Sequence, residues 1–168
     1  MGTSSPTNTQ TIVRADAVEL RLFIEELACN ICRFSHASQD NVEPQSVRIK
    51  QEVRLGGPDA FADIVVNGPR GNYIVEVVYG HSLERVCESI SRKYQRELDW
   101  FKNISKLIVI FDSENHPDQP RLERHLRALI PSHWDLELWD EPDLFSRVRE
   151  HFGIKLESLQ PDALQDVR

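Results

Sequence analysis

The stretch "ADIVVNGPRGNYIVEVVYG", residues 62–80, places one acid in each of two apolar strands that flank a turn. The strands are rich in β-branched and aromatic residues, and "NGPRGN" between them has the composition of a tight turn. A simple hairpin centred on this turn sets Asn67 opposite Asn72 and Asp63 opposite Glu76. The two carboxylates are therefore predicted to lie on one face of the hairpin, with Cβ atoms about 5 Å apart.

This pair of acids raises an electrostatic conflict that a metal ion resolves. Two carboxylates that close cannot both remain ionised at low cost in a poorly solvated site. Glu76 lies inside the apolar run "YIVEVVY", where an unpaired buried acid is costly. A divalent cation removes the conflict, and Mg²⁺ or Mn²⁺ prefers carboxylate, carbonyl and water oxygens. Such an ion activates water and stabilises charge on a phosphate.

The rest of the chain is predicted to alternate helices with strands around this hairpin. Apolar residues at spacings of three and four predict helices, whereas alternating or continuous apolar runs predict strands. The expected helices cover 16–34, 82–102, 121–130 and 141–153, and the expected strands 47–55, 61–66, 72–79, 106–111 and 134–139. This order, α-β-β-β-α-β-α-β-α, predicts an α/β sandwich with a mixed central sheet flanked by helices. The first strand is expected to direct four apolar side chains to one face: Val47, Ile49, Val53 and Leu55.

Length and composition predict one globular domain without a membrane span. The 168 residues are 40% hydrophobic and 28% charged, and no apolar run approaches the roughly 18 residues of a membrane helix. We expect a disordered N-terminal tail over 1–14, a single domain over 15–156 and a C-terminal tail over 157–168.

Net charge and cysteine content limit the binding partners and the cellular compartment that we expect for this protein. The net charge of −7 argues against a protein that grips nucleic acid by bulk positive charge, although a local basic face is compatible with it. Three cysteines are too few, and odd in number, for a disulfide framework, and the N-terminus has no secretory signal. A reduced cytoplasmic location is the expectation.

An acid on one strand and a glutamate on the next, after a first helix and before a long second helix, resembles the PD-(D/E)xK restriction-endonuclease-like superfamily. The resemblance covers about residues 16–153. It implies a three-layer sandwich in which Asp63 and Glu76 bind Mg²⁺ or Mn²⁺, with the carbonyl of Val77 as a further ligand. It also implies a nuclease that hydrolyses phosphodiester bonds of nucleic acid, with DNA as the expected substrate. Such domains often act as homodimers or in larger complexes.

The chain departs from the superfamily pattern at Val78, which occupies the position of the motif lysine. Some similar proteins recruit the basic residue from the following helix, where Lys93 is the candidate; Lys50 on the first strand is a weaker substitute. The first helix could add a further acid, either Glu19 or Glu26. The alternative is a nuclease fold that has lost catalysis with the lysine and serves as an interaction or sensing module.

Other residues carry weaker hypotheses. Asp59, the acid of a literal Pro-Asp dipeptide, is a second candidate for the motif aspartate; the hairpin pairing places it opposite Gly80, beyond the glutamate, so Asp63 is preferred and Asp59 is kept as a group that could support the ligands. His81 follows a strand end where it could assist a site. Cys29, Cys32 and His36 lie on adjacent turns of the first helix and have the residue types of a zinc site, but a fourth ligand is not evident, and small buried cysteines are common in cores.

The segment 91–102 concentrates basic residues in an acidic protein, with two aromatic residues between them: Arg92, Lys93, Arg96, Lys102, Tyr94 and Trp100. A basic ridge on the helix next to a metal site would suit a phosphate backbone. Equally, the charges could form a solvated helix face and the aromatic residues part of the core.

Overall fold

The computed structural model describes residues 7–56, 59–68 and 71–152. In chain order the elements are α1 (Thr7–Asp40), η1 (Pro44–Ser46), β1 (Arg48–Arg54), β2 (Phe61–Gly68), β3 (Gly71–Val77), α2 (Leu83–Tyr94), η2 (Asp99–Asn103), β4 (Ile104–Ile110), α3 (Gln119–Arg127), β5 (Asp135–Trp139) and α4 (Glu141–Phe152). The order of helices and strands is the predicted one, with two short 3₁₀ helices added.

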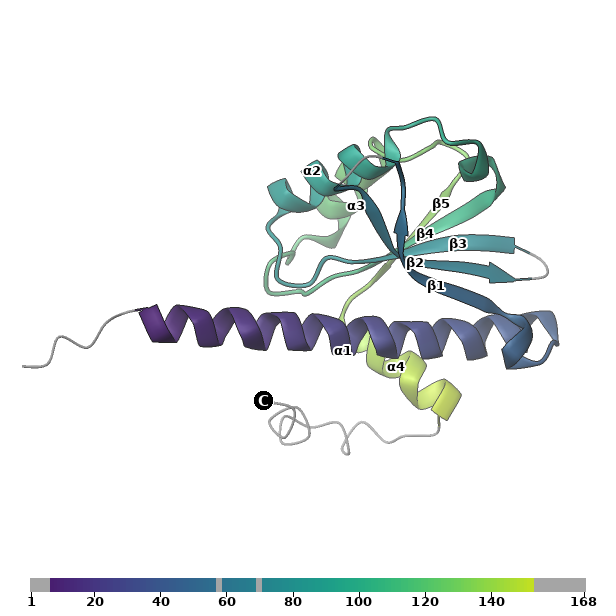
Figure 1. Ribbon diagram of the computed structural model, residues 1–168, viewed down its shortest axis with the longest axis horizontal. Coiled ribbons are helices and arrows are strands. Elements are labelled where there is room, and N and C mark those ends of the chain that lie inside the picture. Colours follow the sequence, from purple (N-terminus) through teal and green to yellow (C-terminus); the bar gives the residue numbers. More distant parts are fainter. Residues whose placement is uncertain (1–6, 57–58, 69–70, 153–168) are drawn as a thin grey trace, which may run out of the picture.

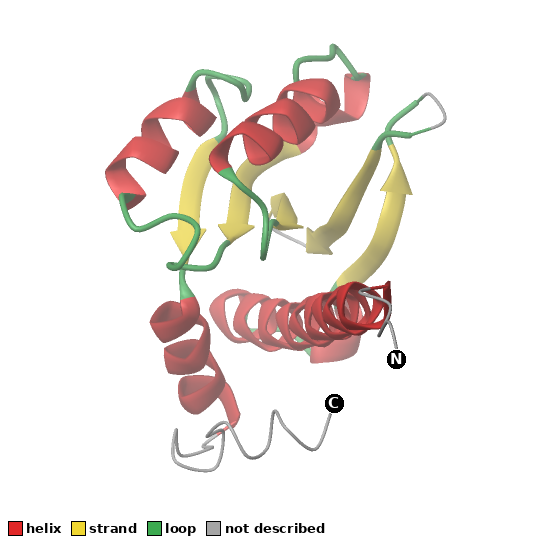
Figure 2. Ribbon diagram, turned by 90° about the vertical axis from the view of Figure 1, so that its left-hand side faces the viewer, coloured by secondary structure: helices red, strands yellow, loops and turns green. Residues whose placement is uncertain are grey.

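The strands form one mixed sheet in the order β1-β2-β3-β4-β5, antiparallel from β1 to β3 and parallel from β3 to β5. Helices cover both faces of this sheet, α1 and α4 on one and α2 and α3 on the other (Figure 1). The turned view shows the sheet between the two helical layers, with the long α1 seen nearly end-on (Figure 2). The predicted fold class, a three-layer α/β arrangement with a mixed sheet, is confirmed.

Each face of the sheet has its own apolar core. The core beneath α2 and α3 includes Ile74, Val78, Val86, Ile90, Leu107, Leu122 and Leu126. The core beneath α1 and α4 includes Ile24, Ala28, Ile31, Val66, Val75, Ile108 and Val148. Strands β2, β3 and β4 alternate between these two cores, as expected of strands buried on both faces. Among the described residues, no helix is both long and apolar enough to cross a membrane.

The hairpin pairing matches the prediction. Asn67 pairs with Asn72 and Ile64 with Val75, so the same pairing, continued by one position, sets Asp63 opposite Glu76. The residues of the turn itself, 69–70, lie outside the described residues. The pairing is specified by apolar burial on both faces, because a slip of one residue would exchange the side chains between the two cores.

The prediction for β1 is wrong in one respect, because its apolar side chains do not share a face. Val47 and Ile49 pack in the core under α1, whereas Val53 and Leu55 pack in the core under α2. The strand changes face at Glu52, which has a φ of 50°. A positive φ is unfavourable for a residue with a Cβ, and such strain often marks a functional site.

Two helices differ in length from their predictions. Helix α1 begins at Thr7, inside the stretch predicted as a tail, and runs on to Asp40. Helix α2 ends at Tyr94, because Gln95 has a non-helical ψ of 38°, and the chain resumes as η2. The apolar spacing continues through Phe101, which η2 buries, so the sequence carries no sign of this break. The predicted C-terminal tail, 157–168, lies outside the described residues.

Candidate active site

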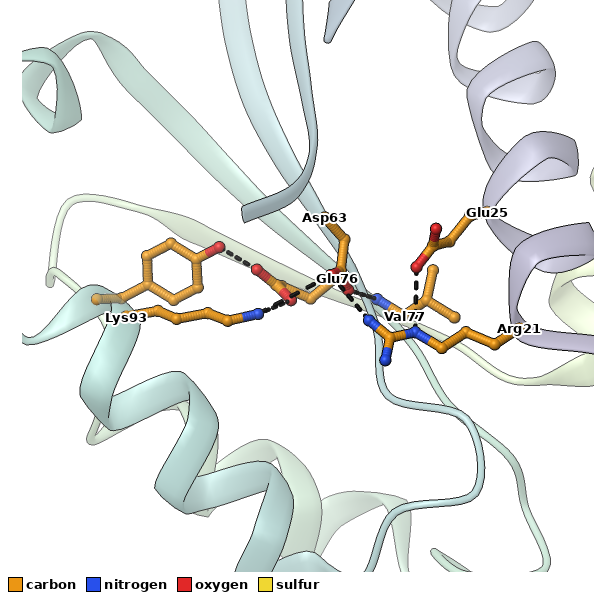
Figure 3. A network of polar contacts seen from close by, with 7 residues as sticks. Arg21, Glu25, Asp63, Glu76, Val77 and Lys93 are labelled. Carbon is orange, nitrogen blue, oxygen red and sulfur yellow. Dashed lines mark hydrogen bonds and ion pairs between the residues drawn. The ribbon is translucent and has the colours of Figure 1, made fainter. Parts of the chain in front are cut away.

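Strands β2 and β3 bring Asp63 and Glu76 together. Both side chains are buried, with residue exposures of 7% and 1%. The Oδ2 atom of Asp63 accepts a hydrogen bond of 2.9 Å from the backbone N–H of Val77, which locks the aspartate to the strand that carries the glutamate. Figure 3 shows the two carboxylates side by side at the centre of a polar network.

Helix α2 directs two side chains onto Glu76. The helix begins at Leu83, and the Oγ of Ser82, the N-cap residue, accepts a hydrogen bond from the N–H of Arg85 at 3.4 Å. The Nζ atom of Lys93 lies 2.8 Å from Oε2 of Glu76 and 4.0 Å from Oδ1 of Asp63. The hydroxyl of Tyr94 donates to Oε1 of the same glutamate. Both oxygens of Glu76 are therefore held from α2.

The packing of Val78 against α2 also explains how Lys93 of the same helix comes within reach of Glu76. Residues 76 and 78 of a strand point to the same face. Val78 is 4% exposed and packs in the core with Val86 and Ile90 of α2. Position 78 therefore makes an apolar contact with α2, and Lys93, one turn beyond Ile90 on the same helix, places its ammonium group beside Glu76.

Helix α1 approaches the carboxylates from the other side, opposite Lys93 (Figure 3). The Nη2 atom of Arg21 lies 3.1 Å from Oδ1 of Asp63, and its Nε lies 3.1 Å from Oε1 of Glu25. Arg21 and Glu25 are four residues apart, so they share one face of the helix. The side chain of Arg21 is 38% exposed, whereas that of Glu25 is 9% exposed.

Arg21, Asp63, Glu76 and Lys93 border a pocket of about 420 Å³. Its lining combines acidic, basic and apolar residues: Arg21, Glu52, Asp59, Phe61, Asp63, Glu76, Val77, Val78, His81, Ser89, Arg92 and Lys93. The pocket is therefore formed by α1, α2 and the ends of the first three strands. Its mixed polar lining suits a charged ligand better than an apolar one.

Burial controls the protonation of the acids. Burial and the neighbouring charge of Asp63 raise the pKa of Glu76 to about 8, against the opposing effect of Lys93. Burial and Asp63 also raise the pKa of Glu25, against the effect of Arg21. For His81, burial and then the charges of Arg85 and Arg21 lower the pKa from 6.5. The imidazole is therefore neutral at neutral pH and able to accept a proton.

The donor set suits a hard divalent cation. Burial and the charge of Asp63 raise the pKa of Glu76, so the pair gains from an added positive charge, and Asp63, Glu76 and the carbonyl of Val77 are oxygen ligands of the kind that Mg²⁺ and Mn²⁺ bind. Among the described residues, no group of three or more His, Cys, Asp or Glu side chains could hold a metal. Any ion here would therefore depend on two carboxylates, a backbone oxygen and water.

Of the predicted site residues, Asp63, Glu76 and Lys93 converge, and Asp59 and His81 line the same pocket. Lys50 is exposed on β1, and the described lining of the pocket does not include it.

The hypothesis of a further acid at Glu19 or Glu26 is wrong, because both are exposed; Glu25 is the acid of α1 that reaches the cluster. The spacing of three and four along the first helix did not distinguish these positions.

The zinc hypothesis is not supported within the described residues, where no metal-ligand group includes Cys29, Cys32 and His36. Cys32 and His36 belong to the core against β3, and Cys29 is half-buried. Gly68 makes room for His36, because a Cβ at position 68 would lie 1.5 Å from Nε2 of its ring. The spacing of the three residues therefore reflects helix packing.

The basic segment 91–102 divides into inward and outward groups. Lys93 and Tyr94 are buried at the site, while Arg96 is bound to the backbone carbonyls of Leu55 and Gly56. Lys102 is exposed. Arg92 is exposed and lines the pocket. The segment therefore does not form one continuous basic ridge.

Sequence reasoning missed Arg21, Glu25 and Tyr94. The spacing of Arg21 and Glu25 signals an ion pair on a helix surface, but not its place against a strand acid. Tyr94 falls on the apolar stripe of α2, which is why a position in the core was one of the two alternatives for it. Its ring is indeed in the core, and only its hydroxyl belongs to the site.

Comparison with models of protein families finds no match, and comparison with the sequences of characterised proteins also finds none. Among solved structures, the chain is similar to SfsA of Pyrococcus furiosus in complex with Ca²⁺, at 13% sequence identity and a TM-score of 0.32. The similarity covers 62% of this chain and 52% of that one, so it spans about half the length of SfsA.

Proposed function

We propose that this domain is a metal-dependent nuclease of the PD-(D/E)xK kind, which hydrolyses phosphodiester bonds of nucleic acid. The observation that supports the proposal is the place of Lys93. Its Nζ lies 2.8 Å from Glu76 and 4.0 Å from Asp63, although it comes from α2 and not from the motif position on β3. An acid pair on adjacent strands with a lysine on the same pocket wall is a constellation suited to metal-dependent phosphodiester hydrolysis.

Each residue has a distinct role in this proposal. Asp63, Glu76 and the carbonyl of Val77 would hold Mg²⁺ or Mn²⁺. When bound, the ion supplies Lewis-acid stabilisation of the phosphate and a more acidic water. Lys93 keeps a positive charge beside the acids and can donate a hydrogen bond to the attacking water. His81, neutral and in the same pocket, can accept a proton.

The proposed substrate is DNA, bound through its backbone. Arg92 lies in the wall of the pocket and Arg21 is partly exposed beside it, so two guanidinium groups can reach phosphates. The chain as a whole carries a net charge of −7, which opposes binding to a polyanion. We therefore propose that targeting depends on a second copy of the chain or on a larger complex.

One observation favours a second candidate, a non-catalytic interaction or sensing module. All four oxygens of the acid pair already have partners: Arg21 and the N–H of Val77 at Asp63, and Tyr94 and Lys93 at Glu76. A network satisfied in this way is stable without a metal. In this reading the cluster holds α1, α2 and the hairpin together and performs no chemistry.

Cleavage and metal binding separate the two candidates. With the full chain, we expect Mg²⁺- or Mn²⁺-dependent nicking of a supercoiled plasmid and binding of Mn²⁺ in isothermal titration calorimetry. Glu76→Gln should reduce cleavage by about 100-fold or more, because it removes a charged ligand at the reacting centre. Glu26→Gln, an exposed acid on α1, is the matched control and should cleave normally. Absence of both cleavage and Mn²⁺ binding would favour the non-catalytic module.

A further inference from the structure

Arg21 is the more accessible of the two cations at Asp63. The same oxygen, Oδ1, lies 3.1 Å from Nη2 of Arg21 and 4.0 Å from Nζ of Lys93. The side chain of Lys93 is 10% exposed, whereas that of Arg21 is 38% exposed. Lys93 is also anchored to Glu76 at 2.8 Å, behind the pair of acids. The contact between Arg21 and Asp63 is therefore more exposed to solvent than the contact between Lys93 and Glu76.

The position of the guanidinium conflicts with a metal on the same oxygen. A divalent ion coordinated to Oδ1 of Asp63 would lie within a few ångströms of Nη2 of Arg21, where like charges repel strongly in a partly buried site. Three acids and two bases meet in the cluster, namely Glu25, Asp63, Glu76, Arg21 and Lys93. The cluster thus has acidic capacity for an added cation, but the contact of Arg21 with Asp63 must open to admit it.

Glu25 defines where Arg21 goes after that contact opens. Its Oε1 accepts a hydrogen bond of 3.1 Å from Nε of Arg21, whereas Asp63 accepts from Nη2, so the two carboxylates use different nitrogens of the guanidinium. The bond to Glu25 joins two residues of one helix and does not involve Asp63. It can therefore keep the arginine at the mouth of the pocket while both Nη groups become available. A guanidinium presents paired donors that match two oxygens of one phosphate.

We propose that Arg21 has two successive partners, Asp63 in the metal-free protein and a substrate phosphate once a divalent cation has taken Asp63. This inference rests on the proposed nuclease function, because it assigns a positioning residue to the same pocket. Glu25 holds the arginine through the change. Metal binding and phosphate binding are then coupled, since the event that fills the acid pair also releases the phosphate-binding group.

The affinity for Mn²⁺ tests the first part of the proposal, that a divalent cation displaces Arg21 from Asp63. The free Mn²⁺ signal in electron paramagnetic resonance gives the affinity of the full-length wild type, Arg21→Gln and Arg21→Lys, without any need for turnover. We expect Arg21→Gln to bind Mn²⁺ at least about five-fold more tightly, because no side chain competes for Asp63. Arg21→Lys keeps the charge but cannot bond Glu25 and Asp63 with separate nitrogens. Its Mn²⁺ affinity should therefore fall between those of the wild type and Arg21→Gln. Arg33→Gln, on the same helix, should match the wild type.

Binding of a short DNA duplex tests the second part of the proposal, that the released Arg21 binds a substrate phosphate. Fluorescence anisotropy in saturating Ca²⁺ should show that Arg21→Gln weakens DNA binding about five-fold or more, while Arg33→Gln does not. Circular dichroism verifies that each variant is folded. Tighter Mn²⁺ binding together with weaker DNA binding by Arg21→Gln supports the proposal.

The outcomes also separate this inference from the proposed function. An unchanged or weaker Mn²⁺ affinity of Arg21→Gln overturns the displacement of Arg21, even if the wild type cleaves DNA. Unchanged DNA binding overturns its role toward phosphate. Tighter Mn²⁺ binding and weaker DNA binding in a protein that never cleaves leave the inference supported and overturn the nuclease.

Discussion

Two polar clusters lie on the same sheet and differ in their balance of acids and bases. The carboxylate cluster joins α1, α2, β2 and β3 and contains Arg21, Glu25, Asp63, Glu76 and Lys93. The Glu137 cluster joins β4, β5 and α4 and contains Lys106, Glu137, Trp139 and Arg147. The first has more acids than bases, while the second surrounds a single acid with two bases and an indole N–H.

The pKa values of the two glutamates show what this balance does. In the carboxylate cluster, burial and Asp63 raise the pKa of Glu76 to about 8 despite Lys93. Burial would also raise the pKa of Glu137, but hydrogen bonds from Trp139 and Arg147 together with Lys106 outweigh it, so that its pKa is lowered. One cluster therefore gains from an additional positive charge, whereas the other is already neutralised by its own side chains.

The largest expected difference between the clusters comes from removing a lysine. Lys93→Met leaves the buried acid pair without its nearest base and should lower the free energy of unfolding by about 3 kcal/mol, the lower end of the range for a broken buried ion pair, because Glu76 with its raised pKa can take up a proton. Lys106→Met, in the Glu137 cluster, should cost about 1 kcal/mol or less, because both partners there are 34% exposed. Urea denaturation followed by circular dichroism at neutral pH measures both. Equal losses would show that the clusters do not differ in this way.

The double variant Glu76→Gln/Lys93→Met shows whether the loss comes from the orphaned acid. Removing both charges should restore much of the stability lost in Lys93→Met, because replacement of a buried pair costs less than breaking it. If the double variant is no more stable than Lys93→Met, the lysine contributes through packing of its alkyl chain.

The next expected effect concerns the tyrosine hydroxyls. Tyr94→Phe removes the donor to Oε1 of a buried glutamate and should cost about 1–3 kcal/mol. Tyr79→Phe is the matched change, since its hydroxyl donates at 3.2 Å to Oε1 of Glu141, which also accepts from the N–H of Ser113. Because Tyr79 is only partly buried, Tyr79→Phe should lower the free energy of unfolding by less than Tyr94→Phe in the same denaturation experiment. The reverse order would mean that Glu76 does not depend on the hydroxyl of Tyr94.

Most of the fold can be predicted from local patterns in the sequence. The turn "NGPRGN" and the apolar strands on both sides fix the pairing that sets Asp63 opposite Glu76. The continuous run around Leu107 indicates a strand buried on both faces, and β4 pairs in parallel with both of its neighbours. The change of face at Glu52 could not be predicted, because it depends on one backbone φ that the alternating pattern does not encode.

Two parts of the site were predictable: the two acids, which the pairing of β2 with β3 brings together, and the base on α2, the helix that follows β3. Lys93 was a candidate because proteins of the superfamily that the chain resembles can supply the basic residue from the helix that follows the acids. Arg21 and Glu25 reach the site because α1 crosses the sheet next to β2, and that placement is set by tertiary packing. A helix pattern identifies which face is apolar, but not which polar residue at its margin meets a strand acid.

The smallest expected effect lies in the acid dependence of the Glu137 cluster. Because the pKa of Glu137 is lowered from 4.5 in the folded protein, its carboxylate stabilises the fold above that pH, and the contribution is lost as pH falls through the folded value. Glu137→Gln should therefore reduce the loss of stability between neutral and acidic pH. The difference should be about 1 kcal/mol or less, since the side chain is 34% exposed.

Urea denaturation at a series of pH values, for the wild type and Glu137→Gln, measures this difference directly. Lys106→Gln should reduce the acid dependence partly, because Lys106 is only one of the groups that lower the pKa of Glu137. Parallel losses in the wild type and Glu137→Gln would mean that the three donors do not offset the burial of this carboxylate. The two clusters would then share the same electrostatic character, and an excess of acids would no longer distinguish the site around Asp63 and Glu76.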